Sequence, residues 1–397
     1  MPDIELPFSR DEYADRLARV RRNMDEDGID VLIATDPSNM AWLTGYDGWS
    51  FYVHQAVIVP PKGDPVFWGR RMDAAGALRT CYMGEDDIIG YPDDFVMSEE
   101  RHAMEHLAAV ITDRGWAGLT IASEHENYYY SARAHRVLCR TLGRETADGT
   151  GLVNWARAVK SPTEIGYMRR AARISEAVQA RVREVIHAGM RGNEVAAEIY
   201  RTALMGGEDE AGPFGGDYPA IVPLMPQGRD ASAAHLTWSE RPYVGDAGIF
   251  FELSGCYRRY HAPLCRTVYL GEPPAEMLRA EAAVVEGIED GISAARPGRT
   301  AGDVARAFYA ALGRHGVKRE GRCGYPIGLS YPPDWGERTF SIRPSDETVL
   351  EAGMTFHFMP AIWTTDWGLE ITEPLLVVED GPAEPFCSTP RKLFVKP

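Results

Sequence analysis

The sequence predicts an α/β protein (α+β in its larger part) of two domains, and three observations support this prediction. Helical and strand patterns alternate over the first 150 or so residues, a strong helix start falls near residue 160, and a weak repeat follows it. At 397 residues, 45% of them hydrophobic, the chain can bury full-sized cores. We therefore expect one domain over residues 1–159 and a second over residues 160–397.

The first domain alternates helices with short apolar runs that predict a mixed or parallel sheet. Helices are expected at residues 11–27, where Tyr13, Leu17 and Val20 share one face, and at residues 100–112. The run Asp-Pro-Ser-Asn at 36–39 is typical of a turn. Strands are expected at residues 31–34, 56–59, 65–68 and 119–122.

The second domain begins with a helix whose first residues are predicted by a capping motif. Ser161 is expected as the N-cap, Pro162 as the first helical residue and Glu164 as the partner that completes a capping box. Residues 189–196 and, 109 positions later, 298–305 resemble each other, and each opens a further helix. A duplication would give two α/β halves with a pocket where their sheets meet; chance similarity of two helix starts is the alternative.

Charge and cysteine usage exclude several classes of partner. The 42 Lys and Arg against 58 Asp and Glu give a net charge of −16, which opposes binding to nucleic acid or to an anionic membrane surface. No window approaches a membrane span, and no signal peptide is evident. The scattered cysteines form no CxxC pair, so we expect reduced thiols in a soluble, cytoplasmic protein: Cys81, Cys139, Cys256, Cys265, Cys323 and Cys387.

Three stretches resemble a known superfamily. Residues 160–172, the repeat, and residues 245–267 are similar to the creatinase and aminopeptidase P superfamily, and the resemblance covers nearly the whole chain. It implies a pita-bread catalytic domain after a smaller creatinase-type α/β domain. Residues 36–55 resemble the signature of bacterial ectoine hydrolases. That resemblance implies ring opening of the cyclic amidine ectoine to an N-acetyl-2,4-diaminobutyrate, with the acetyl group on either amine.

The same resemblance predicts that the site holds no metal and no cofactor. Metallopeptidases of the superfamily bind two metal ions through two Asp eleven residues apart, one His and two Glu. The corresponding positions here are Glu252, Pro263, Tyr325, Met359 and Thr372, although a small shift would place Glu370 or Glu373 at the last one. Proline and methionine offer no oxygen ligand, so a two-metal mechanism is not expected.

Loss of the metal ligands has two interpretations. The protein is either a silent scaffold, which binds a ligand or partner without catalysis, or an enzyme that hydrolyses its substrate without metal, as creatinase does. The creatinase base is a His in an Ala-His segment, which Ala234 and His235 match, but Cys265 stands where its acidic partner would fall. We expect Glu252 to act as base or nucleophile and His235 to transfer protons. The structural alternatives are a packed His235 and a Glu252 paired with Arg258 or Arg266.

Ectoine is a cyclic amidinium ion that carries a carboxylate, which suits aromatic faces, acids and an arginine. For most of the aromatic candidates named below, packing in a hydrophobic core is the alternative to substrate binding. In creatinase-like dimers the N-terminal domain of one subunit covers the site of the other, so a homodimer with a lid at residues 49–54 is implied. A downstream deacetylase is a further expected partner, and creatine or another amidine is the alternative substrate. The candidate substrate-binding residues are His261, Glu370, Glu373, Trp49, Phe51, Tyr52, Asp217, Tyr331, Trp335, Arg338 and Trp363.

Overall fold

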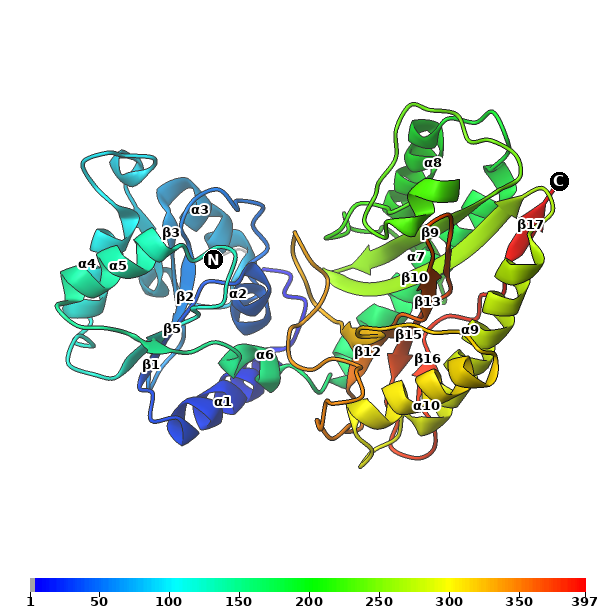
Figure 1. Ribbon diagram of the computed structural model, residues 1–397. Helices are drawn as coiled ribbons and strands as arrows, with labels where there is room; N and C mark the ends of the chain where they lie inside the picture. The colour runs from blue at the N-terminus through cyan, green and yellow to red at the C-terminus, as the bar shows by residue number, and fades with distance from the viewer. Residues whose placement is uncertain (1–3) are drawn as a thin grey trace. The chain divides into compact units, whose positions relative to one another are not determined.

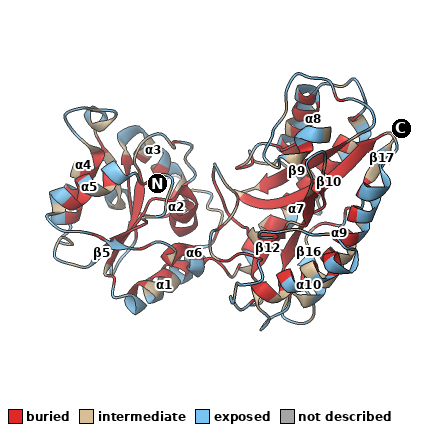
Figure 2. Cartoon of the chain, viewed as in Figure 1, coloured by how far each residue is buried: buried red, intermediate tan, exposed pale blue. Residues whose placement is uncertain are grey.

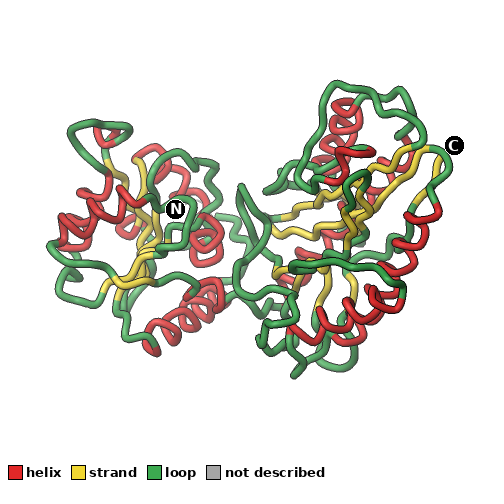
Figure 3. The backbone as a smooth tube through the Cα atoms, in the orientation of Figure 1, coloured by secondary structure: helices red, strands yellow, loops and turns green. Residues whose placement is uncertain are grey.

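The computed structural model describes residues 4–397, which fall into two compact units, residues 4–157 and residues 158–397 (Figure 1). Helices and strands alternate through both units (Figure 3). Among the described residues, no helix has the length and apolar character needed to cross a membrane. All six cysteines are buried and free, as expected for reduced thiols.

The first unit is a mixed six-stranded sheet with strand order β4-β3-β2-β1-β5-β6. β1 pairs antiparallel with β2 and parallel with β5, which confirms the mixed sheet. Ile33 and Trp68 of the sheet pack in one cluster with Leu107 of α4 and Leu138 of α5. The helices are α1 (Arg10–Glu26), α2 (Pro37–Thr44), α3 (Arg71–Thr80), α4 (Ala103–Asp113), α5 (Ala132–Leu142) and α6 (Leu152–Ala156). The strands are β1 (Val31–Ala34), β2 (Ala56–Val59), β3 (Val66–Arg70), β4 (Ile88–Tyr91), β5 (Ile121–Ser123) and β6 (Ala147–Asp148).

The turn expected at residues 36–39 is wrong, because these residues begin a helix. Asp36 is the N-cap of α2, where its Oδ1 accepts the Ser38 N–H at 2.8 Å, and Pro37 occupies the first helical position. Buried Glu124 accepts the backbone N–H groups of Thr35 and Asp36 at 2.6 and 2.8 Å. The residue types that favour a turn also favour a capped helix start, and tertiary contacts decide between the two.

The second unit contains a three-stranded sheet (β17-β10-β9), a four-stranded sheet (β11-β12-β15-β16) and two strand pairs (β13-β14 and β7-β8). Its helices are α7 (Pro162–Val185), α8 (Gly192–Met205), α9 (Ala275–Ala294) and α10 (Ala301–Arg314). Its strands are β7 (Gly207–Asp209), β8 (Gly212–Phe214), β9 (Ala247–Tyr257), β10 (Tyr260–Leu270), β11 (Gly324–Pro326), β12 (Thr355–Phe358), β13 (Ala361–Trp363), β14 (Gly368–Glu370), β15 (Glu373–Leu376), β16 (Glu384–Pro385) and β17 (Phe394–Lys396).

Helix α7 begins as the sequence predicts and supports the long β9–β10 ribbon. The Ser161 hydroxyl accepts the Glu164 N–H at 3.2 Å, while the Glu164 carboxylate accepts the Ser161 N–H at 2.8 Å. Further along α7, Gln179 donates from Nε2 to the carbonyls of Phe251 and Leu264 at 2.8 and 3.0 Å. One buried amide thus fixes both strands of the ribbon against the helix.

The sequence repeat corresponds to a repeated local structure. The Gly189 N–H donates to the Tyr243 carbonyl at 2.8 Å, and the Gly298 N–H donates to the Leu350 carbonyl at 2.9 Å. Arg191 and Thr300, the N-caps of α8 and α10, form antiparallel bridges with Pro242 and Val349. Both halves therefore tie a helix start to the segment that leads into the following sheet, which supports duplication over chance.

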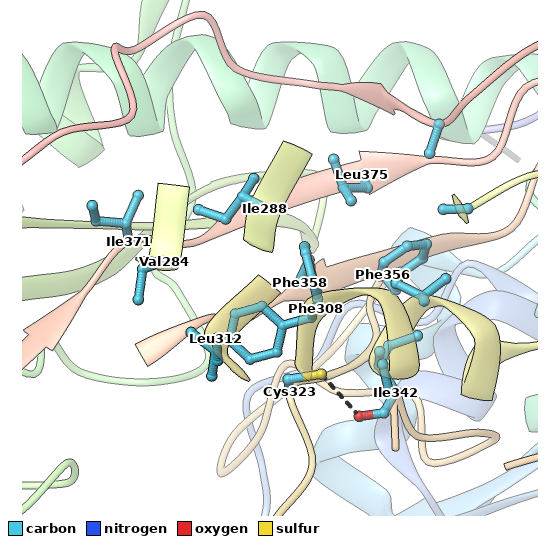
Figure 4. Packing of buried hydrophobic residues seen from close by; sticks show 14 of the residues in the cluster. Val284, Ile288, Phe308, Leu312, Cys323, Ile342, Phe356, Phe358, Ile371 and Leu375 are labelled. Carbon is cyan, nitrogen blue, oxygen red and sulfur yellow. Dashed lines mark hydrogen bonds between the residues drawn. The ribbon is translucent and has the colours of Figure 1, made fainter. Parts of the chain in front are cut away.

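Two hydrophobic clusters of the second unit leave one face of the ribbon for other chemistry. Phe308 of α10 packs on Phe358 of β12, and Ile288 of α9 and Leu375 of β15 lie in the same cluster (Figure 4). A second cluster joins α7 and α8 to Phe251 and other residues of the ribbon. The ribbon is buried along nearly its whole length (Figure 2).

The apolar stretch at residues 369–378 contains two strands, which belong to different sheets. β14 pairs with β13, whereas β15 pairs with β12. Between them the Ile371 N–H donates to the Pro360 carbonyl at 3.2 Å and the Thr372 N–H to the Cys265 carbonyl at 3.2 Å. Because of this break, the side chains of Glu370 and Glu373 have different surroundings.

Candidate active site

The candidate site lies on the face of the β9–β10 ribbon opposite α7. Side chains alternate along a strand, and directly opposed residues of an antiparallel pair share a face. Glu252 is directly opposite Cys265, and Ser254 is opposite Pro263. His261, Pro263 and Cys265 therefore line the same face as Glu252.

Glu252 is a buried acid in an apolar strand. Its backbone exchanges hydrogen bonds of 2.9 and 3.0 Å with Leu224, and its side chain is surrounded by protein. Burial raises the pKa of this carboxyl from 4.5 to about 7, because desolvation disfavours the charged form. The expected alternative partner Arg266 is occupied elsewhere, so the group is poised to exchange a proton near neutral pH.

Glu370 is a second buried acid on the same site. Its backbone N–H and carbonyl both bond the Thr267 hydroxyl at 2.9 Å, which holds β14 against the ribbon. Both carboxyl oxygens are buried without a hydrogen bond of ordinary geometry. Burial raises the pKa of Glu370 well above its usual range, and the charge of Glu252 raises it further. Two carboxyl groups so placed resist being ionised together.

Glu373 serves the structure instead. It lies three residues beyond Glu370, past the strand break, and is completely buried. Arg266 and Arg391 donate to its Oε1 at 2.6 and 3.0 Å. Because Arg266 also donates to four backbone carbonyls, this ion pair fixes the C-terminal segment to β10.

A buried hydrogen-bonded chain of three rings stands beside the two acids. Trp335 donates from Nε1 to the Tyr325 hydroxyl at 2.8 Å, and that hydroxyl lies 3.0 Å from Nδ1 of His357. Burial lowers the pKa of His357 to about 3, so the ring is neutral. Burial and the charge of Glu252 raise the pKa of Tyr325 well above its usual range. Nε2 of His357 has no partner, which leaves one polar atom for a ligand.

His261 contributes a neutral ring to the same face. Its Nε2 accepts the Ala220 N–H at 2.9 Å, so the proton of the neutral ring is assigned to Nδ1. Burial lowers the pKa of His261 to about 3. Nδ1 is buried and has no partner, so it is a free donor. The ring lies 6.3 Å from that of Trp335.

Other predicted residues of the second unit lie away from this face or serve the fold. His235 is exposed in the loop after the short helix Gly228–Ser232, and Arg338 is exposed with φ of 54°. Asp217 accepts the Arg259 N–H at 3.2 Å and so supports the tight β9–β10 turn. Tyr331 is buried with Arg259 5.5 Å from its ring centroid.

Trp363 and Arg319 lie near the acids. The Arg319 guanidinium is 5.2 Å from the Trp363 ring centroid, and its charge partly opposes the raised pKa of Glu370. The indole nitrogen of Trp363 is buried without a partner. Sequence reasoning missed Arg319, which no motif marks.

The three predicted aromatics of the first unit lie together in one loop. The rings of Trp49 and Phe51 are 5.0 Å apart. Tyr52 is 62% exposed, and its hydroxyl accepts a hydrogen bond from Arg70 at 3.1 Å. Trp49 and Tyr52 are the exposed members of this group, and exposed aromatic side chains are typical of a loop that covers a binding site.

Both units of this architecture match known protein families. Residues 16–159 match the model of the creatinase/prolidase N-terminal domain, and residues 166–379 match that of metallopeptidase family M24. The chain belongs to family M24. Over the full length of both chains it is 55% identical to the ectoine hydrolase of Halomonas elongata. It is 41% identical to an uncharacterised hydrolase/peptidase of Sinorhizobium fredii, with 98% of this chain and 99% of the relative covered.

Solved structures of the family share the fold. The dipeptidase PepE of Mycobacterium ulcerans superimposes with a TM-score of 0.80 at 22% identity, covering 98% of this chain and 99% of that one. The prolidase of Pyrococcus horikoshii gives a TM-score of 0.79 at 18% identity, covering 96% and 100%. The pita-bread fold with a creatinase-type N-terminal domain is thus confirmed.

The metal centre implied by the name of family M24 does not fit the residues present. Of the five ligand positions, four hold proline, tyrosine, methionine and threonine. The Thr372 hydroxyl accepts the Cys265 N–H at 2.8 Å, and the Tyr325 hydroxyl is used by Trp335. Even with Glu370 counted at the last position, the set has two carboxyl groups where the metallopeptidases have four and a His, which is too few to hold two divalent ions.

Proposed function

We propose that this protein hydrolyses the cyclic amidine ectoine, opening its ring to an N-acetyl-2,4-diaminobutyrate, and that it needs no metal ion. The family and the 55% identical ectoine hydrolase support a hydrolase that acts on a carbon–nitrogen bond. One observation carries the finer proposal. Glu252 and Glu370 are buried together, and among residues 4–397 neither forms an ion pair.

Such a pair favours a cationic ligand. A buried carboxylate without a counter-ion is costly, and a bound amidinium removes that cost by charge neutralisation and N–H donation. The unpartnered oxygens of Glu370 are acceptors for those N–H groups. Trp335 adds a buried aromatic ring near His261. Creatine and other amidinium or guanidinium compounds share this chemistry, so they remain the alternative substrates.

The same pair supports hydrolysis. Ionised Glu252 either takes a proton from a water molecule that adds to the amidinium carbon, or adds to that carbon itself. The carbon–nitrogen bond of the resulting tetrahedral centre breaks, and the leaving ring nitrogen takes up a proton. In the second case a water molecule adds to the same carbon after the ring has opened, and the bond between that carbon and Glu252 then breaks. The raised pKa of Glu370 supports that carboxyl as the protonated partner. Water is thereby divided between an amide carbon and an ammonium group, and the charge balances. His235, exposed in this chain, stays a predicted proton carrier.

The test compares wild type with Glu252→Gln and with Glu347→Gln, an exposed acid of the same unit. Each protein is treated with chelator, incubated with ectoine or creatine, and followed by proton NMR. Ring opening of ectoine by wild type and Glu347→Gln, with none by Glu252→Gln, supports the proposal. Full turnover by Glu252→Gln refutes the role of that carboxyl. Loss of wild-type turnover after chelation refutes metal independence, and binding without turnover supports a silent scaffold.

The proposed assembly is a homodimer in which Trp49, Phe51 and Tyr52 of one subunit cover the site of the other. The resemblance to creatinase-like dimers supports it, and so does the exposure of two of these rings. Light scattering measures the oligomeric state of wild type and of Trp49→Ala, and a turnover assay measures the Michaelis constant of each for ectoine. A dimer whose Michaelis constant for ectoine rises in the variant supports the lid, and a monomer with full activity refutes it. A deacetylase partner for the product, and cytoplasmic location, stay predictions.

A further inference from the structure

A second cluster of reactive side chains lies in the first unit, on residues that the proposed reaction does not use. His135 and Cys139 are four residues apart on α5, which places them on one helical face. Glu145, just before β6, approaches them. His135 Nε2 lies 3.4 Å from a Glu145 oxygen and 3.7 Å from Cys139 Sγ, and the three ligand atoms all lie within 4.8 Å of one another.

The spacing matches the coordination sphere of a small ion. Zinc bonds of about 2.0–2.3 Å in a tetrahedron put neighbouring ligand atoms roughly 3.3–3.8 Å apart. The 3.4 and 3.7 Å separations fall within that interval. Two anionic ligands, a thiolate and a carboxylate, would neutralise a divalent ion, and the imidazole adds no charge.

His125 lies beside the cluster, outside the set of three converging ligand atoms. Its ring centroid lies 4.6 Å from that of His135. One ring nitrogen lies 3.4 Å from the Thr146 hydroxyl, which is 4.0 Å from Cys139 Sγ; the other lies 3.9 Å from the Asp148 carboxylate.

We propose that this protein binds a zinc-type divalent transition metal ion through His135, Cys139 and Glu145. The donors come from α5 and from the segment just before β6, so the ion ties the edge of the sheet to the helix. Glu145 is exposed and Cys139 is buried, which leaves an entry from solvent. The site is separate from the proposed catalytic residues, and its test does not depend on ectoine turnover.

Cobalt(II) is the probe, because a cobalt–thiolate bond gives an ultraviolet charge-transfer band. The full chain is first stripped with chelator, then titrated with cobalt, and zinc is added in competition. We expect the band in wild type, its loss on zinc addition, and proton release on binding. A coordinating cysteine binds as the thiolate, so its proton is released when the ion binds.

Variants assign the ligands. Cys139→Ser should lose the band, whereas Cys81→Ser, which removes another buried thiol of the same unit, should keep it. Glu145→Ala and His135→Ala replace exposed and half-buried side chains, so they keep the fold, and each should weaken zinc binding at least tenfold by calorimetry. No thiolate band in wild type, or equal zinc affinity in all four variants, overturns the site.

Discussion

Replacing Glu252 by glutamine should make the protein more stable above neutral pH while abolishing the proposed turnover. In the folded chain the carboxyl is buried and its pKa is raised from 4.5 to about 7, so the folded state holds the proton more tightly than the unfolded state. Below pH 4.5 both states are protonated and glutamine is a near isostere. As pH rises from 4.5 to 7 the folded protein loses stability that the variant keeps.

The magnitude follows from the pKa difference. Each tenfold change in proton affinity is worth about 1.4 kcal/mol, so the ionised group costs the folded state roughly 3 kcal/mol above pH 7. For a unit of this size, that corresponds to a melting temperature about 6–12 °C higher in Glu252→Gln at pH 8. The gain should shrink toward zero near pH 4.5.

Thermal unfolding of wild type and variant across pH 4.5–8.5 measures this difference, with Glu373→Gln as the matched control. The control makes the same substitution at a buried acid that two arginines pair. There we expect destabilisation of about 3–5 kcal/mol, because buried Arg266 loses its partner. If Glu252→Gln is also less stable than wild type at pH 8, the carboxyl is a paired structural acid and its place in the site is wrong.

Three further predictions concern the same unit. Turnover of ectoine should rise as pH increases through about 7, where Glu252 ionises, and a pH–rate profile that falls across this range would contradict its role as base or nucleophile. Tyr325→Phe removes the acceptor of Trp335 Nε1 and the partner of His357, and should cost about 1–3 kcal/mol in urea unfolding; an unchanged midpoint would show that the chain of rings is not structural. Gly255→Ala should yield insoluble or strongly destabilised protein, because its Cβ would overlap the Ala171 carbonyl of α7; normal expression and melting would contradict that packing.

Local signals predicted the fold where they agreed with tertiary contacts. The capping box of α7 needs only Ser161, Pro162 and Glu164, all within one turn, and the structure has it. The repeat was visible because both copies use the same helix start. At Asp36 the local signal allowed two outcomes, and the buried carboxyl of Glu124, distant in sequence, decided for a helix.

The site was harder to predict because it depends on register and on a strand break. Glu370 and Glu373 look alike in sequence, and only the break between β14 and β15 gives one to the site and the other to Arg266. His357 could have been noticed as a polar residue in an apolar strand, two positions before a former metal-ligand position. Its partner Tyr325 follows only from the pairing of β11 with β12.

The altered ligand positions and the proposed substrate class have one physical explanation. A metal pair polarises a neutral amide carbonyl, whereas an amidinium carbon is already electrophilic because it carries the positive charge. Removing the metals also removes their neutralisation of the surrounding acids, so the acids that stay buried must be protonated or must meet a cation. Burial raises the pKa of Glu252 and of Glu370, and the charge of Glu252 raises that of Glu370 further. A cationic substrate therefore ionises the group that attacks it, and a neutral peptide does not. This difference favours amidinium compounds over peptides without any change in the fold.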